Sequence, residues 1–154
     1  MKTFCRLYYR IPFSETDAMG IVHHSNHAKY LERGRVEFLR LIGSSYGEVV
    51  KAGFHFPLTE LRTEFKRPLV FDEVILIETE ISKLTRTRMN FSYKIYSVKE
   101  LALPSLAHEP FTERAKVLGE TFHCCTNMQN RPVEVSPELF ATLQGAYGGQ
   151  DDND

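Results

Sequence analysis

The arrangement of this chain is decided by one stretch near its N-terminus, Phe13-Ser14-Glu15-Thr16-Asp17-Ala18-Met19-Gly20-Ile21-Val22-His23-His24-Ser25-Asn26-His27. It places a carboxylate in a turn, a glycine three residues later, a short apolar pair and then a histidine-rich helix start. The helix is predicted to run from about His24 to Ile42. The unpaired N–H groups and the positive dipole end of that helix are then expected beside Asp17. This pairing suits acyl-transfer chemistry, in which negative charge develops on a carbonyl oxygen.

Apolar and polar residues alternate just before this stretch, which predicts a first strand with one buried face. That face is expected to carry Cys5, Leu7, Tyr9, Ile11 and Phe13. Within the helix, apolar and small residues share one broad face, which is expected to pack on a sheet. A glycine inside a helix costs roughly 1 kcal/mol relative to alanine. We therefore interpret Gly34, together with Ala28, as a point where the sheet approaches the helix backbone closely.

The rest of the chain reads mostly as strands. The expected strands lie at residues 54–67, 74–84, 89–95 and 115–126, with a Pro-punctuated loop at 101–110. A helical turn or two is expected at 46–53, and Ser136 followed by Pro137 predicts the start of a last, short helix. This order indicates an α+β fold, an antiparallel sheet of about five strands wrapped around one long helix. A single domain is expected over residues 1–147, followed by an acidic tail at 148–154 that is expected to be disordered.

The composition is that of an ordinary soluble globular protein, with 154 residues, 42% hydrophobic and 25% charged, and a net charge of −1. That charge is too small for a nucleic-acid partner. No apolar run approaches the roughly 18 residues of a membrane span, and no signal-peptide pattern opens the chain. Cys5, Cys124 and Cys125 lack metal-ligand spacing, which favours reduced thiols in a cytoplasmic protein. Without a P-loop, GxSxG or GxGxxG motif, nucleotide hydrolysis, α/β-hydrolase and Rossmann chemistry are excluded.

Several motifs keep a shared spacing over roughly residues 4–135, namely Thr16–Val22, His24–Asn26, Tyr30–Arg35, Glu37–Arg40 and, more weakly, Phe65–Glu73. On these motifs the chain resembles the hotdog-fold acyl-CoA thioesterases, specifically the 4-hydroxybenzoyl-CoA thioesterase-like group and its Tol–Pal-associated branch. The resemblance implies a hotdog fold and hydrolysis of a small or aromatic acyl-CoA, or acyl-carrier, thioester without a metal or organic cofactor. It also implies a homodimer or homotetramer with sites at the subunit boundary.

The same resemblance assigns roles to residues of the opening stretch. Asp17 occupies the position of the catalytic aspartate, as nucleophile on the thioester carbonyl or as general base for water. His24 is a second catalytic candidate, which would bond the substrate, orient Asp17 or be a satisfied polar residue. The backbone N–H groups of Val22, His23 or His24 are expected to polarise the thioester oxygen. The substrate-binding candidates are Gly20, Ile21, Val22, His23 and Asn26, with Asn26 also interpreted as a hydrogen-bond organiser at the helix start.

Three alternatives remain open from the sequence. A carboxylate such as Asp17 in a turn before a helix is also typical of a structural cap, which would leave a non-catalytic acyl-CoA-binding or scaffold protein. The run His55-Phe56-Pro57 is similar to part of the hotdog dehydratase motif, so an acyl-thioester dehydratase or hydratase is a second enzyme hypothesis. His23 and His27, four residues apart, have a spacing that can hold a metal, although no further ligand completes the set.

Other charged residues have less specific interpretations. Arg35 falls on the sheet-facing side of the helix and is expected to form a buried ion pair with a carboxylate. Glu60 and Glu64 are interpreted as solvent-facing residues of a strand. Four cations are candidate contacts for the phosphates of coenzyme A or ordinary strand-edge charges, namely Lys66, Arg67, Arg86 and Arg88.

Overall fold

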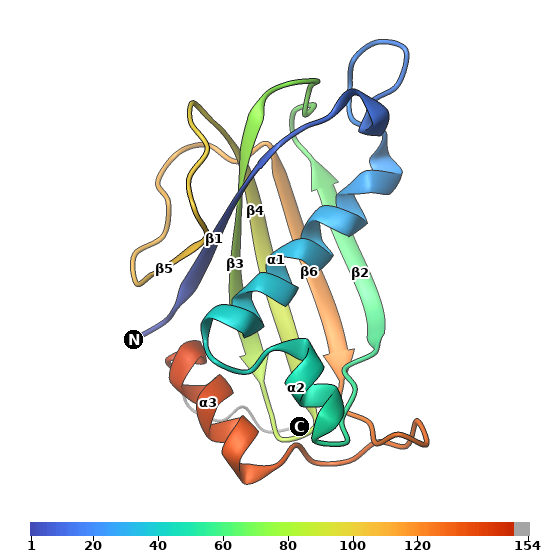
Figure 1. Cartoon of the computed structure of the whole chain (residues 1–154), viewed down its shortest axis with the longest axis vertical. Helices are drawn as coiled ribbons and strands as arrows, with labels where there is room; N and C mark the ends of the chain where they lie inside the picture. Colours follow the sequence, from blue (N-terminus) through green and yellow to red (C-terminus); the bar gives the residue numbers. More distant parts are fainter. Residues whose placement is uncertain (150–154) are drawn as a thin grey trace.

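The computed structural model describes residues 1–149, and its centre is a six-stranded antiparallel sheet packed against one long helix (Figure 1). The strand order is β2-β6-β4-β3-β1-β5. The strands are β1 (Phe4–Arg10), β2 (Leu58–Phe65), β3 (Val74–Leu84), β4 (Arg88–Val98), β5 (Ser105–Ala107) and β6 (Val117–Cys124). The helices are α1 (His27–Leu41), α2 (Tyr46–Lys51) and α3 (Pro137–Tyr147), with short 3-10 turns η1 (Phe13–Glu15) and η2 (His24–Asn26). This α+β arrangement is the hotdog fold, as predicted.

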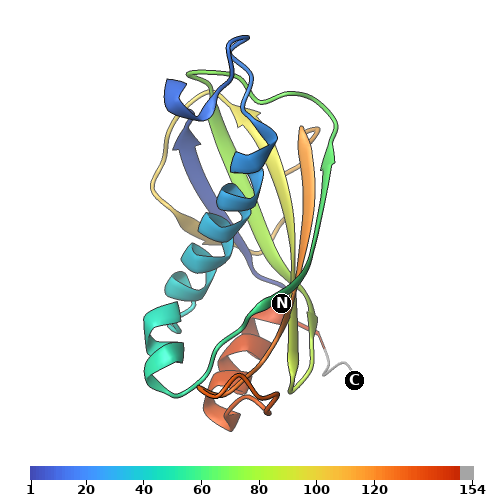
Figure 2. The same cartoon turned by 90° about the vertical axis from the view of Figure 1, so that its right-hand side faces the viewer.

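Helix α1 lies along one face of the sheet, as Figure 2 shows from the side. Its buried residues are His27, Tyr30, Leu31, Gly34, Phe38 and Leu39. The predicted close approach at Gly34 is confirmed, because a Cβ built there would meet Thr79 Oγ1 and would lie 3.0 Å from Ile77 Cγ2, both on β3. Ala28, the other small residue of the prediction, is exposed and contributes nothing to this contact.

The two faces of the sheet differ because side chains alternate along each strand. On β4, Tyr93 and Ile95 are buried toward α1, whereas the alternating Lys94 is exposed on the opposite face. On β6, Val117 and Gly119 likewise face the helix, with Leu31 packed on Gly119. We call the face opposite α1 the outer face of the sheet.

Most predicted elements are present, and the predicted cap of the last helix is confirmed. Ser136 Oγ accepts a hydrogen bond from the Leu139 N–H at 3.3 Å, with Pro137 at the first helical position. The sheet has one strand more than the predicted number of about five, because residues 105–107 of the expected loop pair with β1, opposite Phe4–Arg6. The first strand also ends at Arg10 rather than Phe13, since Pro12 leads into η1. Residues 150–154 of the predicted tail lie outside the described residues.

Candidate active site

The candidate site is a tight turn that follows β1 and precedes α1. Its two arms are joined by hydrogen bonds from the Asp17 N–H to the Ile21 carbonyl (2.8 Å) and from the His23 N–H to the Glu15 carbonyl (3.0 Å). Gly20 adopts a positive φ of 77°, which a side chain would disfavour, and its N–H bonds the Asp17 carbonyl at 3.0 Å. The turn therefore brings Asp17 and Gly20 to its tip and leads the chain directly into the helix.

The Asp17 carboxylate is held by the backbone of its own turn. Its Oδ1 accepts hydrogen bonds from the N–H groups of Met19 (2.8 Å) and Ile21 (3.2 Å). Among residues 1–149, Oδ2 has no hydrogen-bond or ion-pair partner, and the side chain is exposed. One oxygen thus fixes the carboxylate while the other stays available to a substrate. Ile21, which the sequence predicts to bind the substrate, therefore already donates its backbone N–H to Asp17.

The sequence offers three backbone N–H groups at the helix start that could polarise the thioester oxygen, and in the described residues one of the three is without a hydrogen-bond partner. The Val22 N–H donates to the Leu69 carbonyl at 2.8 Å, and the His23 N–H donates to Glu15. These two candidates for polarising a carbonyl are therefore already hydrogen-bonded within the chain. The His24 N–H, first in η2, makes no hydrogen bond in the described part of the protein. Such an N–H group at a helix N-terminus can donate a hydrogen bond to an anion or to a polarised carbonyl oxygen.

The three histidines of the stretch have different surroundings. His23 caps η2, since its Nδ1 accepts from the Ser25 N–H at 3.3 Å, and its ring lies 4.2 Å from that of exposed His24. His27 is buried edge-on against Phe65 with ring centroids 4.7 Å apart, and burial lowers the pKa of its imidazole. Within residues 1–149, no group of three metal-ligating side chains includes the His23 and His27 pair.

Glu15 anchors the turn, and sequence reasoning missed it. Its carboxylate accepts hydrogen bonds from the hydroxyls of Tyr9 on β1 (2.9 Å) and Tyr30 on α1 (2.5 Å). Its carbonyl accepts from the buried Asn26 side chain at 2.9 Å, so Asn26 acts as an organiser of the helix start. Burial, followed by the Glu15 hydrogen bond, raises the pKa of Tyr30. The available signal was a glutamate two residues before Asp17 with tyrosines on both flanking elements.

The surface around the turn is apolar and uncovered in the single chain. Phe13 is 66% exposed and Met19 82% exposed. Phe13 and the exposed Phe71 stack edge to face with ring centroids 5.5 Å apart. Exposed apolar residues also lie on the edge strand β2, namely Leu58, Leu61 and Phe65. The candidate site is therefore bordered by exposed apolar side chains that no other part of the described chain covers.

The other sequence candidates lie apart from the turn. Arg35 is half-buried, but its guanidinium contacts the Tyr93 hydroxyl, and among residues 1–149 no carboxylate pairs with it, so the predicted ion pair was wrong. Arg86 stacks on Phe140 of α3, near the end of the sheet away from Asp17 (Figure 1). His55 pairs through its backbone with Thr126, just beyond the end of β6.

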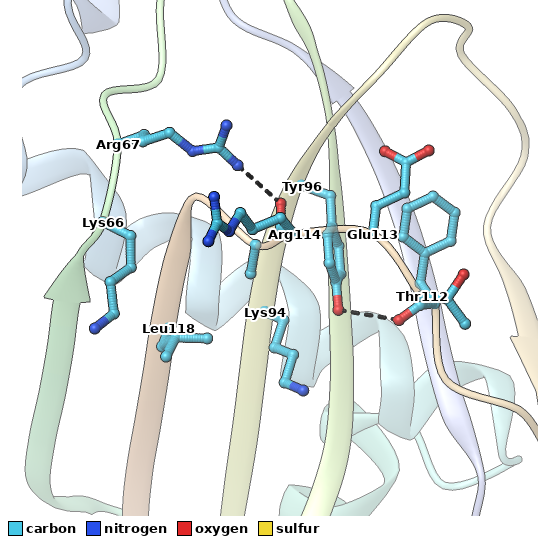
Figure 3. A pocket seen from close by; sticks show the side chains of 10 residues that line it. Lys66, Arg67, Lys94, Tyr96, Thr112, Glu113, Arg114 and Leu118 are labelled. Atoms are coloured by element: carbon cyan, nitrogen blue, oxygen red, sulfur yellow. Dashed lines mark hydrogen bonds between the residues drawn. The ribbon is translucent and has the colours of Figure 1, made fainter.

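The charged residues of β2 and of the two positions that follow it comprise two paired glutamates and several cations. Glu60 pairs with Arg62 at 3.0 Å, and Glu64 pairs with Lys66 at 2.9 Å, all on exposed side chains. These contacts confirm the solvent-facing interpretation of the two glutamates. Lys66 and Arg67 line a cleft on the outer face of the sheet, which Figure 3 shows from close by.

Comparison with known proteins gives one consistent result. Residues 11–143 match the thioesterase-like superfamily. A protein of Aquifex aeolicus, described as a candidate esterase, is 40% identical over 87 residues, which are 56% of this chain and 68% of that protein. The acyl-CoA thioesterase YbgC of Helicobacter pylori is 28% identical over 144 residues, covering 92% of this chain and 98% of that one. The crystal structure of a hypothetical protein from Aquifex aeolicus superposes with a TM-score of 0.76 at 30% identity, covering 90% and 98% of the two chains.

Proposed function

The chain belongs to the thioesterase-like superfamily and is a thioester hydrolase, and we propose that it hydrolyses a small or aromatic acyl-CoA with Asp17 as the reacting carboxylate. The observation that carries the proposal is the turn itself. Asp17 keeps one carboxylate oxygen without a partner in the described residues, and the free His24 amide lies at the helix start on the same turn. A nucleophile or base beside a fixed hydrogen-bond donor is the minimal requirement for acyl transfer.

We assign separate roles to the His24 N–H and to the Asp17 carboxylate. The His24 N–H hydrogen-bonds the thioester oxygen, where negative charge develops, and a donor of this kind is worth roughly 3 kcal/mol in the transition state. Asp17 either attacks the carbonyl carbon or removes a proton from the attacking water. In both routes the carbon–sulfur bond breaks, the thiolate leaves and is protonated from solvent, and water supplies the second oxygen of the free acid. The His24 imidazole, exposed beside the turn, is proposed to bond the substrate or to orient Asp17.

A panel of acyl-CoA thioesters assayed with a thiol reagent tests this function. Release of thiol from short, branched or aromatic acyl-CoA is expected, and failure to hydrolyse every acyl-CoA and acyl-carrier thioester would overturn the proposal. Single turnover in heavy-oxygen water then separates the two routes. Label in the Asp17 carboxylate indicates a mixed anhydride that water opens at the Asp17 carbonyl. When the label is confined to the product acid, trapping of acylated Asp17 with hydroxylamine distinguishes an anhydride opened at the acyl carbonyl from general-base catalysis.

We also propose that the site is completed by a second copy of the chain, in a homodimer or homotetramer. The open apolar surface around Asp17 and the exposed apolar residues of the edge strand β2 support this, because an uncovered strand edge favours pairing with another strand. Light scattering at micromolar concentration should report a dimer or larger. Leu61→Lys should shift the protein toward monomer, whereas Leu103→Lys, at a loop residue 86% exposed, should not. A wild-type monomer would contradict the assembly.

We propose a cytoplasmic location as part of the same function. The three free cysteines support it, because Cys5 and Cys125 are buried and Cys124 is half-buried without a disulfide. Among residues 1–149, no helix has the length and apolarity to cross a membrane. Fractionation of cells that express the protein, with a periplasmic or secreted marker as control, measures the location directly.

A further inference from the structure

The connection between β2 and β3, residues 66–73, lies against the candidate site from outside the turn. Figure 1 shows the turn and this connection at the same end of the sheet. The Leu69 carbonyl accepts the Val22 N–H at 2.8 Å, and the Phe71 N–H donates to the Gly20 carbonyl at 2.9 Å. The connection therefore holds the turn both at its tip and just before the free amide of the helix start.

The same connection also binds the chain that leads into the turn. The Ile11 N–H donates to the Glu73 carbonyl at 3.0 Å, and the Asp72 N–H donates to the Ile11 carbonyl at 2.9 Å. Ile11 is buried in the core, so this entry to the turn is a fixed point of the fold. One short segment thus binds the turn at its entry and at its exit. The position of Asp17 relative to the helix start therefore depends on the shape of that segment.

One ion pair closes the segment on itself. The Lys116 ammonium, just before β6, lies 3.3 Å from both carboxylate oxygens of Glu73 and donates to the Pro68 carbonyl at 3.4 Å. Glu73 Oε2 also accepts the Val70 N–H at 2.8 Å. Between these contacts Asp72 has a φ of 70°, which is uncommon outside glycine and persists where the surroundings fix the backbone. The pair therefore draws the two ends of the segment together.

The pair of Glu73 with Lys116 is much less exposed than the pair of Lys66 with Glu64 at the end of β2. The Glu73 and Lys116 side chains are 11% and 19% exposed, whereas those of Lys66 and Glu64 are 54% and 66% exposed. Exposed ion pairs contribute little, because water screens both charges. A largely buried charge that loses its partner is left uncompensated. Removing one member of the buried pair is therefore expected to distort the segment.

We propose that Glu73 and Lys116 are positioning residues, which fix the distance between the Asp17 carboxylate and the His24 N–H through the segment that they close. The inference rests on the proposed thioesterase function. Acyl transfer requires the carboxylate and the amide at a set separation, and a displacement of about 1 Å can cost about 10²-fold in rate. The rest of the substrate is bound by other contacts, so the pair is expected to act on kcat more than on KM.

The test removes each charge while keeping the size of its side chain. Glu73→Gln retains an oxygen that can accept the Val70 N–H, and Lys116→Met retains the length of the lysine. Each variant should lower kcat about tenfold or more, with KM and the Kd of an unreactive acyl-CoA thioether changed by less than about threefold. The double variant should lose no more than the worse single variant, because the two residues act as one unit.

Glu80→Gln is the matched control. Glu80 pairs with Lys2 at 3.4 Å, and the Lys2 ammonium also donates to the Ile81 carbonyl at 3.1 Å, so the same kinds of contact are present. Lys2 precedes the start of β1, whereas the turn follows the end of that strand. Glu80→Gln should therefore keep kcat within about twofold of the wild type. Thermal melting of every variant confirms that the kinetics refer to folded protein.

Hydrogen exchange of single backbone amides, followed by NMR, tests the positioning without turnover. In Glu73→Gln and Lys116→Met, the amides of Val22 and Phe71 should exchange about tenfold faster than in the wild type, because both hydrogen bonds join the segment to the turn. The amide of Phe140, which bonds the Ser136 carbonyl in α3, is the internal reference and should keep its exchange rate.

Three results would overturn the inference. The first is a normal kcat in the folded charge variants, and the second is a Val22 amide that exchanges in them at the wild-type rate. The third is an equal loss of kcat in Glu80→Gln, because the effect would then follow from any broken ion pair. If the wild type hydrolyses no thioester while the exchange rates respond as expected, the exchange result upholds the positioning and the proposed function alone fails.

Discussion

Gly34→Ala is the sharpest test of how α1 is held against the sheet. The new methyl group would meet Thr79 Oγ1 and approach Ile77 Cγ2 to 3.0 Å. Both are β-branched residues with restricted side-chain rotation, and Thr79 lies between Cys5 and Tyr93 in neighbouring strands, so it has no room to move. Overpacking of this kind costs about 3 kcal/mol at the upper end of its usual range. The gain in helix propensity offsets about 1 kcal/mol.

The net expectation is a loss of about 2 kcal/mol in the free energy of unfolding, which lowers the Tm by about 4–8 °C in a chain of this length. Denaturant unfolding and thermal melting measure it. Gly145→Ala in α3 is the matched control, because no atom lies within 4 Å of its Cβ position. It should raise the stability by about 0.5–1 kcal/mol.

A double variant isolates the contact between the new methyl group and Thr79. Thr79→Ala removes the atom that the new methyl group meets, so Gly34→Ala should cost clearly less in that background. If Gly34→Ala is as stable as the wild type while Gly145→Ala behaves as expected, α1 does not pack as closely on β3 as the contacts at Gly34 indicate. If Gly34→Ala costs the same stability with and without the Thr79 side chain, the contact with Thr79 Oγ1 is not the cause of the loss.

Three further predictions concern the site and its support. Asp17→Asn should lower kcat by about 10²-fold or more with little change in stability, whereas Asp72→Asn, a matched carboxylate exposed on the neighbouring loop, should keep near-normal kcat; an active Asp17→Asn enzyme would refute the assignment. Burial lowers the pKa of His123 to about 4 from its ordinary value of 6.5, so the unfolded chain takes up a proton first as the pH falls. Stability should then drop by about 2 kcal/mol between pH 7 and pH 5, and His123→Gln should remove most of that slope in denaturant titrations; an unchanged slope would contradict it. Tyr30→Phe takes one hydrogen bond from the Glu15 carboxylate and should cost about 1–3 kcal/mol of stability; unfolding curves that overlay those of the wild type would show that Glu15 does not anchor the turn.

The fold was largely predictable because its signals are local and periodic. The alternation in β4 marks a strand that is buried mainly on one face, whereas β3 is marked by its many β-branched residues and is buried on both faces over residues 74–79. Ser136 with Pro137 marks a helix start by capping alone. The short strand β5 escaped prediction because three residues carry no periodicity. It is a strand only because β1 has a free edge opposite Leu106, and that pairing joins residues a hundred positions apart.

The geometry of the candidate site was predictable only where it is encoded in one turn. Asp17 and Gly20 lie at the positions the sequence assigned because the turn supplies its own hydrogen bonds. The residues of the turn did not show which of the Val22, His23 and His24 N–H groups would be without a hydrogen-bond partner. The carbonyl of Leu69, a buried residue between β2 and β3, accepts the Val22 N–H, and the Glu15 carbonyl accepts the His23 N–H, so that only the His24 N–H of the three stays without a partner in the described residues.

The position of Leu69 also makes the proposed reaction depend on a segment outside the turn. Leu69 accepts the Val22 N–H at 2.8 Å, the neighbouring Val70 bridges to Ile21, and the segment is tied to the sheet where the Lys66 N–H bonds the Lys116 carbonyl at 2.9 Å. Pro68→Gly removes the fixed backbone angle of proline within this segment. It is therefore expected to lower kcat, because a looser segment holds the Val22 amide and the helix start less firmly. Steady-state kinetics on a single acyl-CoA measures this effect, and an unchanged kcat would contradict the dependence.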